Sequence, residues 1–356
     1  MANGRQALYS NSSGSQNTAT GASALHNNTT GTSNTANGAS ALRSNSAGVS
    51  NTAVGGRALY RNNASYNTAV GQNAMDSTTT GYSNTAVGEK SLYSNTGGYL
   101  NVAVGGQSLY LNYSGYQNTA VGLNSLHQNV SGDGNTATGD HALYNATGNN
   151  NIAVGSSAGS GLTTGDNNIY LAAVGTSESN TIRIGRFGVQ TRAFVQGVRG
   201  IATANANAIP VVVDSSGQLG TASSSARFKT AIQPMQEASE AILALKPVSF
   251  HYKSDKSGTP QFGLIAEQVA KVDPDLVVSD DKGEIYTVRY EAVNAMLLNE
   301  FLKEHQRVQE LRASDTEQKK EIAELRSQLK EQGEAIRKVS ERVDISASEQ
   351  LIADQR

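Results

Sequence analysis

Hydrophobic and polar positions repeat with a short, regular period through the first 155 residues of the chain. Glycines mark the period at intervals of seventeen residues, shortened twice to sixteen, and most close a motif of the form NTAVG. An apolar residue, usually leucine, follows four positions later in nearly every copy. Such a period predicts a solenoid of stacked coils with one shared core, and it favours a structural protein over a pocket-bearing enzyme. The glycines are Gly4, Gly21, Gly38, Gly55, Gly71, Gly88, Gly105, Gly122, Gly139 and Gly155.

Side chains alternate along the NTAVG motif, so each copy is expected to place some residues inside the coil and the others outside. We expect Thr52 and Val54, with Leu59 from the following turn, to face the interior, and asparagine and alanine to face outward. Gly55 is expected at a tight corner, where a Cβ would clash or φ must be positive. With ~4.8 Å between paired strands, ten coils predict a roll of roughly 45–50 Å.

Two other interpretations of the repeats are disfavoured by the sequence. Low hydrophobicity is also typical of disordered chains, but the strict register of Val and Leu argues against disorder. Aligned threonines would suit an ice-binding ladder, but Val102 and Ile152 interrupt the ladder and look like core positions. The threonines are Thr18, Thr35, Thr52, Thr68, Thr85, Thr119 and Thr136.

Several tyrosines also fall in register from coil to coil. We expect them to form outward ladders or contacts between chains, and a glycan-binding surface is the less favoured hypothesis for the same residues. They are Tyr60, Tyr93, Tyr110 and Tyr144 in one row and Tyr82, Tyr99 and Tyr116 in another.

Composition limits the classes of partner. The 356 residues include neither cysteine nor tryptophan, and a formal net charge of −2 gives no reason to expect a nucleic-acid partner. No apolar stretch approaches the ~20 residues that span a bilayer, and the N-terminus lacks the basic and apolar regions of a signal peptide. Because the chain starts within a repeat, we expect either a structural protein released without secretion or a piece of a longer protein.

The distribution of charge divides the chain into two physically different parts. Charged side chains are scarce before residue 150 and frequent after Ser224. Residues 161–223 lose the repeat and predict a β-rich connector, in which residues 211–213 form a strand that runs into a turn. Residues 224–296 predict a small α+β domain with a helical stretch over 234–245, four short strands and one further short helix.

A three-four spacing of apolar residues predicts a coiled coil over residues 297–345, followed by a frayed tail over 346–356. Asp315, Gln318 and Gln332 interrupt the seam and are expected to fix its register or strand number. Mixed Ile and Leu in the seam permits a trimer. The apolar seam consists of Val308, Leu311, Ile322, Leu325, Leu329, Ile336, Val339 and Val343.

Two short motifs lie in the α+β domain. The segment TASSSARFKTAI places Ser224, Arg227 and Lys229 in the pattern S-x-x-R-x-K, followed by Ile232, and the box GLIAEQV occupies residues 263–269. From composition alone, the first motif reads as a serine-rich linker. Together the motifs resemble the intramolecular chaperone domain of endosialidase-type tail spikes. The same domain occurs as a self-cleaving peptidase in a family of membrane-tethered transcription factors.

The repeats of residues 1–160 resemble the head repeats of trimeric autotransporter adhesins and of phage tail-fibre proteins. In those families each chain forms a left-handed parallel β-roll, and three rolls pack side by side. The two resemblances imply a mainly β, homotrimeric tail-fibre or tail-spike precursor of the virion. They also imply a surface glycan or a host-cell receptor as partner. The alternative is a bacterial trimeric surface adhesin, extracellular or on the cell surface, whose C-terminal domain trimerises without cleavage.

The chaperone resemblance implies a Ser–Lys dyad that cuts its own chain once, as a serine endopeptidase. Ser224 would attack the carbonyl of Ser223 with Lys229 as base, so the cut falls between Ser223 and Ser224. Arg227 would help to keep the lysine neutral, or would hold a carbonyl oxygen or a carboxylate. The supporting candidates are Glu267, Gln268 and His251.

Spacing alone does not bring the serine and the lysine together. Residues five apart are rotated by roughly 140° on a helix and point to opposite faces on a strand. A bend after Ser224, or a neighbouring chain, must therefore join the two groups.

We expect no cofactor and no metal ion. Asp280 and Asp281 do not have the spacing of a calcium loop. A glycan-degrading spike is also disfavoured, because the nearly uncharged roll offers no pair of catalytic carboxylates.

Overall fold

The computed structural model describes residues 1–280 and 282–353, in two compact units, Met1–Gly200 and Ile201–Arg356. Each unit has its own hydrophobic core. Asp281 and residues 354–356 lie outside the described residues. The second aspartate of the rejected calcium loop and the end of the predicted frayed tail are therefore not covered.

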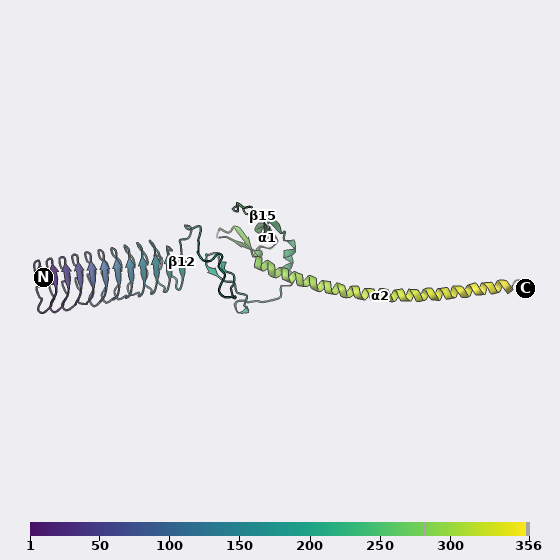
Figure 1. Ribbon diagram of the computed structural model, residues 1–356, viewed down its shortest axis with the longest axis horizontal. Helices are drawn as coiled ribbons and strands as arrows, with labels where there is room; N and C mark the ends of the chain where they lie inside the picture. The colour runs from purple at the N-terminus through teal and green to yellow at the C-terminus, as the bar shows by residue number, and fades with distance from the viewer. Residues whose placement is uncertain (281, 354–356) are drawn as a thin grey trace. The chain divides into compact units, whose positions relative to one another are not determined.

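The first unit is a parallel β-solenoid, which confirms the fold class predicted from the repeats. Twelve short strands form one sheet in sequence order, and each strand pairs with those of the neighbouring coils (Figure 1). The register advances by one repeat, so Thr52 of one coil pairs with Thr68 of the next. The strands are β1 (Ala2–Asn3), β2 (Thr18–Thr20), β3 (Thr35–Asn37), β4 (Thr52–Val54), β5 (Thr68–Val70), β6 (Thr85–Val87), β7 (Val102–Val104), β8 (Thr119–Val121), β9 (Thr136–Thr138), β10 (Ile152–Val154), β11 (Ile169–Leu171) and β12 (Ile182–Ile184).

The buried and exposed faces of the strand are the reverse of those predicted from the alternation of side chains. Ala53 and Asn51 are fully buried, whereas Thr52 and Val54 are only partly buried, on the outer face. Leu59 is buried, as predicted. The narrow interior of each coil is filled by leucine against small alanines. The β-branched residues cover the pleated outer face instead, where strand propensity favours them.

Val102 and Ile152 also lie on the outer face, with 37% and 39% of their surface exposed. The expectation that these two residues are core positions is therefore wrong. The sequence argument against an ice-binding ladder therefore rests only on the interruption of the row of threonines by these two residues.

Buried asparagines form ladders that run from coil to coil. Asn51 donates from Nδ2 to Asn34 Oδ1 at 3.1 Å and to the Ala64 carbonyl at 2.8 Å, and its Oδ1 accepts the Asn67 N–H at 3.0 Å. A buried amide is tolerated only when it is hydrogen-bonded, and here the neighbouring coils supply the partners. The ladder of Asn51 consists of Asn17, Asn34, Asn51, Asn67, Asn84, Asn101, Asn118, Asn135, Asn151 and Asn168.

The corner after each of the strands β1 to β9 needs glycine for both of the reasons expected. Gly55 has φ +128°, and a Cβ there would lie 2.6 Å from the carbonyl oxygen of Gly71. Leu59, four residues later, has φ +53°. β-branched residues avoid this left-handed region, which explains why leucine or methionine holds this position in every coil from Leu8 to Leu143.

The sheet continues through β11 and β12, beyond residue 160, where the sequence placed the end of the roll. Neither strand carries the NTAVG motif. Tyr170 of β11 takes the interior position and is fully buried, with its hydroxyl 3.1 Å from Glu178 Oε1. Arg183 of β12 binds the same carboxylate through two hydrogen bonds of 2.6 Å. An aromatic ring thus fills the coil where the repeat is lost.

Among its described residues, the second unit contains three antiparallel strand pairs, several short helices and one long helix. The first pair, at the predicted strand of residues 211–213, is followed by the α+β domain. The predicted helical stretch of residues 234–245 is present as a 3₁₀ helix, η2. The elements are β13 (Val212–Val213), β14 (Leu219–Gly220), η1 (Ala226–Phe228), η2 (Gln236–Ala244), β15 (Val248–Phe250), β16 (Gln261–Gly263), α1 (Ala266–Val272), η3 (Pro274–Leu276), β17 (Val277–Ser279), β18 (Ile285–Val288) and α2 (Tyr290–Ala353).

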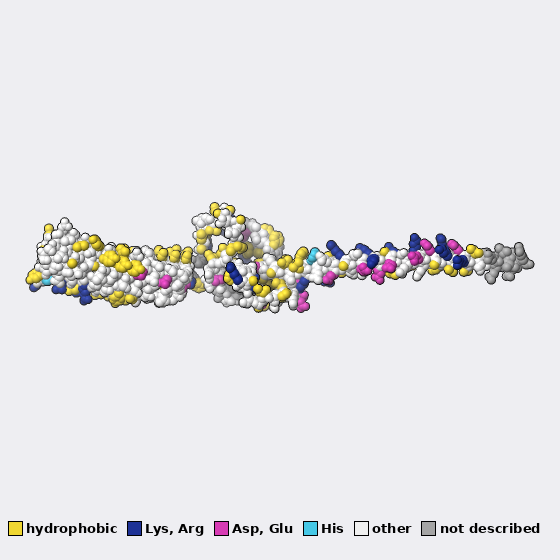
Figure 2. All heavy atoms as spheres, turned by 90° about the horizontal axis from the view of Figure 1, so that it is seen from below, with side chains coloured by type: hydrophobic (Ala, Val, Ile, Leu, Met, Phe, Trp, Pro, Cys, Tyr) yellow, Lys and Arg dark blue, Asp and Glu magenta, His cyan; other side chains and the backbone are white. Residues whose placement is uncertain are grey.

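One continuous helix, α2, includes the predicted coiled-coil segment and continues through residues 346–353. At 1.5 Å per residue its 64 residues extend for about 96 Å. Figure 2 shows charged side chains along α2 and few on the visible face of the roll. The core of the domain is small, and a small core gives limited stability to a single chain. Its buried apolar side chains are Val269, Leu276, Val288 and Met296.

Candidate functional site

The segment from Ser223 to Lys229 is exposed along its whole length. The Ser225 N–H donates to Ser223 Oγ at 3.3 Å, and the 3₁₀ turn η1 follows. Ser225 and Lys229, on either side of this turn, have extended backbone conformations. One tight turn therefore separates Ser224 from Lys229, so the chain bends between the two predicted catalytic residues.

This bend does not assemble a dyad within one chain. Among residues 1–280 and 282–353, no hydrogen bond joins Ser224 Oγ to Lys229 Nζ. Arg227 lies instead over the ring of Phe228, with 4.7 Å between its guanidinium carbon and the ring centre. A lysine becomes neutral most readily when it is shielded from water or lies near other cations. Lys229 is exposed in the single chain, so the observed structure does not supply that shielding.

The GLIAEQV box anchors the β15–β16 hairpin to the start of α2. The Leu264 N–H donates to the Tyr290 hydroxyl at 3.0 Å. A Cβ at Gly263 would lie 2.7 Å from that hydroxyl oxygen, so only glycine permits the contact without a shift. Glu267 and Gln268 lie exposed in the first turn of α1, and no side-chain contact to Ser224 or Lys229 is found among the described residues. His251 is exposed just after β15.

A buried polar cluster that the sequence did not indicate joins η2 to α2. Ser239 is fully buried; its hydroxyl contacts the Glu300 carboxylate and accepts a hydrogen bond from Asn299 Nδ2 at 2.7 Å. Lys303 Nζ lies 2.8 Å from the same carboxylate. Hydrogen bonds from Lys303 and Ser239 lower the pKa of Glu300, and the bond to Glu300 raises the pKa of Lys303. No local motif reveals this cluster, because its two halves are about sixty residues apart.

The tyrosines of the roll form the predicted ladders. Tyr82, Tyr99 and Tyr116 are stacked with ring centres 5.1 and 4.9 Å apart and planes within 2° of each other. Figure 2 shows hydrophobic side chains gathered over the middle of the roll. Rings stacked in this way cover each other's faces and leave their edges and hydroxyls accessible. Stacking of a sugar on a tyrosine face is therefore limited to the ends of a ladder.

The second row mixes tyrosine with other residues. His127 lies between Tyr110 and Tyr144, with ring centres 5.1 and 5.0 Å away. Tyr60 is separated from this stack because Asp76 takes the intervening position. The buried Asp76 carboxylate is held by Arg57 at 2.8 and 3.2 Å.

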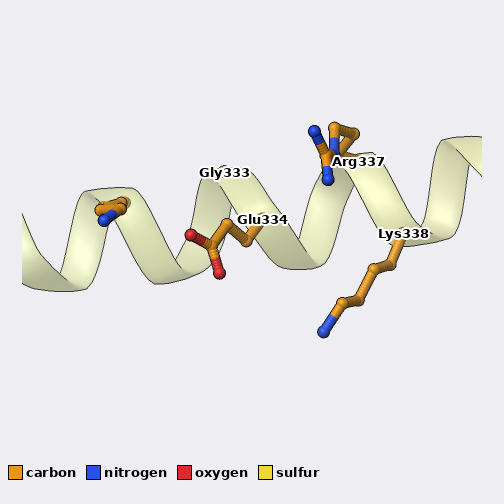
Figure 3. Close-up of a pocket in the computed structure, with 5 residues that line it drawn as sticks. Gly333, Glu334, Arg337 and Lys338 are labelled. Carbon is orange, nitrogen blue, oxygen red and sulfur yellow. The ribbon is translucent and has the colours of Figure 1, made fainter.

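The described residues offer no metal site and no membrane-spanning helix. No three or more His, Cys, Asp or Glu side chains gather there closely enough to hold a metal ion, and none of the helices is apolar enough to cross a membrane. A depression of about 310 Å³ lies on α2 at residues 330–338. Figure 3 shows that Glu334, Arg337 and Lys338 extend from a single helix in different directions, so nothing there encloses a ligand.

Comparison with known proteins assigns the segment that contains the two motifs. No curated protein and no solved structure matches the chain. Residues 224–278 match the family model described as chaperone of endosialidase. The match begins at Ser224 and includes Lys229 and the GLIAEQV box. It supports a role of this segment in folding and trimerisation and, with the β-solenoid before it, supports a protein of the tail-fibre or tail-spike type.

Proposed function

We propose that the chain is the precursor of a trimeric fibre or spike, in which residues 224–356 act as a self-cleaving intramolecular chaperone. The match of residues 224–278 to the endosialidase chaperone family is the observation that carries this proposal. The β-solenoid is the product, and the α+β domain and α2 bring three chains together before they are released.

The single chain exposes the apolar surface that such an assembly would cover. Leu311, Leu329 and Ile336 of the predicted seam are between 62% and 70% exposed on α2. On the roll, the outer-face residues Ile182 and Ile184 of β12 are exposed as well. Contiguous exposed apolar surface is typical of interfaces. Both parts of the chain therefore have a surface for contact with further copies.

The near-identity of the coils gives a physical reason why the roll would need a chaperone. A shift by one coil would leave most contacts of the roll in place, so the register of three chains is poorly specified by the repeats themselves. A bundle of α2 helices would set the register first. Once folded, the roll would be kinetically trapped, and loss of the chaperone would not unfold it.

The proposed cleavage uses Ser224 and Lys229 in one turnover. Neutral Lys229 takes the hydroxyl proton while Ser224 Oγ attacks the carbonyl carbon of Ser223. The peptide C–N bond then breaks, and Lys229 returns the proton to the leaving amine of Ser224. Water hydrolyses the resulting ester, which leaves a carboxylate on Ser223 and a free N-terminus on Ser224. Arg227, Glu267 and Gln268 are supporting residues in this proposal.

Intact-mass measurement of the purified protein tests the proposal. We expect two fragments that meet between Ser223 and Ser224, and full-length chains for Ser224→Ala and for Lys229→Ala. Ser225→Ala is the matched control and should still be cut. A wild-type trimer that stays uncut would favour the alternative, a surface adhesin whose C-terminal domain only trimerises.

For the mature roll we propose attachment to a host or surface receptor, with a glycan as one candidate. The tyrosine ladders support this proposal, because their edges and hydroxyls form a regular row on a surface with little charge. Binding of the released roll to an array of glycans, compared with Tyr99→Ala, would test it. Equal binding by both proteins would exclude the ladder as the site.

A further inference from the structure

An apolar groove of about 590 Å³ lies in the α+β domain between η2, the β15–β16 hairpin and the first turns of α2. Leu245, Phe262 and Leu264 line one side, and Tyr290 and Leu297 of α2 line the other. Phe262 is 83% exposed. Open apolar surface of this kind is typical of interaction sites.

The first turns of α2 present apolar residues on three sides. One side packs on its own domain, through Met296 in the core and Lys303 in the polar cluster. A second side carries Leu297, which extends the predicted coiled-coil seam back to the groove. Leu298 and Leu302 form a third side and are 59% and 55% exposed.

Helical geometry separates this third side from the domain of the same chain. Leu298 and Leu302 lie about 100° and 140° around the helix axis from Leu297 in one direction. Met296 and Lys303 lie about 100° and 120° from Leu297 in the opposite direction. A chain therefore cannot cover its own Leu298 and Leu302 with its own groove.

The side of α2 that carries Leu298 and Leu302 is apolar only where the helix lies beside the α+β domain. Further along α2, the positions that continue the rows of Leu298 and Leu302 are polar or charged. They are His305, Gln309, Arg312, Thr316 and Lys319. Because these leucines occur only beside the domain, they indicate a partner surface at the same position along the helix axis. The groove is an apolar surface at that position.

We propose that the groove of one chain receives Leu298 and Leu302 from α2 of the next copy. The inference rests on the proposed trimer. In a parallel ring of identical helices, one flank of each helix faces the opposite flank of its neighbour. The domain-bearing flank of one chain therefore meets the leucine-bearing flank of the next. Three such contacts close the ring and bury the groove, so the domains and helices interlock around the axis.

A disulfide placed across the contact tests the inference. The chain has no cysteine, so every disulfide in the Phe262→Cys, Leu298→Cys variant must join introduced thiols, in a Ser224→Ala background that keeps the chain whole. The two single-cysteine variants show how much of the product comes from links between equivalent residues. Mild oxidation should give covalent dimers and trimers on a non-reducing denaturing gel. The matched control pairs Phe262→Cys with Arg312→Cys, on the same flank about 21 Å further along α2, and should stay monomeric.

A second variant covers the case in which the thiols are badly aligned. Leu298→Glu with Leu302→Glu should abolish the trimer in light scattering, whereas Arg312→Glu should retain it. A trimer that tolerates both glutamates and cross-links no more than the control pair overturns the groove contact and leaves the proposed function intact. A wild-type chain that is monomeric overturns both.

Discussion

The asparagine ladder allows a quantitative test of what holds the roll together. Asn101 is fully buried; its Nδ2 donates to Asn84 Oδ1 at 3.2 Å and to the Gly115 carbonyl at 2.8 Å. Its Oδ1 accepts hydrogen bonds from the N–H and the Nδ2 of Asn118, at 3.0 and 3.2 Å. In Asn101→Ala, Asn84 Oδ1 and the Gly115 carbonyl each keep another donor. The Asn118 N–H is left buried without its acceptor.

An unsatisfied buried donor costs about 1–3 kcal/mol, and each further lost hydrogen bond about 1 kcal/mol net. We therefore expect Asn101→Ala to destabilise its coil by about 3 kcal/mol. Because each coil contacts only its neighbours, the loss should be local. Hydrogen exchange of peptides around residues 84–122 should accelerate by about 10²-fold, since 1.4 kcal/mol corresponds to a factor of ten.

The control for this measurement is Thr119→Ala, on the outer face of β8. Its side chain is only partly buried, so its removal should cost about 0.5 kcal/mol or less, as surface substitutions usually do. If Asn101→Ala exchanges at the wild-type rate, or if Thr119→Ala has the larger effect, the ladder is not a source of stability. The orientation of the strand residues would then have no energetic consequence.

Two further predictions concern the corner and the aromatic row. Gly55→Ala should unfold the coil, because φ is +128° and a Cβ would lie 2.6 Å from the Gly71 carbonyl oxygen. The control is Gly56→Ala, whose Cβ would have open space around it. This variant should give a soluble protein with the melting temperature of the wild type. Burial lowers the pKa of His127 below its ordinary value of about 6.5, so its neutral form stabilises the roll above that pH. The melting temperature should fall as the pH decreases below about 6.5, and His127→Phe should reduce this pH dependence; an unchanged dependence would contradict the assignment.

The sequence predicted the solenoid because period and register are local properties, but it did not predict which face is inside. Alternation along NTAVG gives two faces, and hydrophobicity favours Val54 over Asn51 for the interior. The outcome is the reverse, because the amide of Asn51 is satisfied by Asn34 and Asn67 of the neighbouring coils. Those hydrogen bonds exist only once the coils are stacked, so they cannot be predicted from the sequence of a single repeat.

At the candidate site, too, the sequence revealed the local motif but not the contacts that form only in the folded chain. The S-x-x-R-x-K motif identified a segment that the family match also includes, and the structure adds the tight turn between Ser224 and Lys229. The contact between the two groups stays a prediction. The cluster around Ser239 escaped sequence analysis because Glu300, its partner, belongs to another helix far along the chain.

The proposed cut falls within the second unit, after the β13–β14 hairpin and before the α+β domain, and it leaves the whole β-solenoid on one fragment. The asparagine ladder that contains Asn51 is hydrogen-bonded within one chain, and the roll has its own hydrophobic core, so it keeps these interactions after the cut. The α+β domain has a small core, an open groove and a helix with exposed leucines, and in the proposed trimer further copies would cover this surface. Cleavage between Ser223 and Ser224 would separate the roll from this surface. A site that is exposed and unassembled in one chain, and completed by a neighbour, would delay that cut until three chains have met.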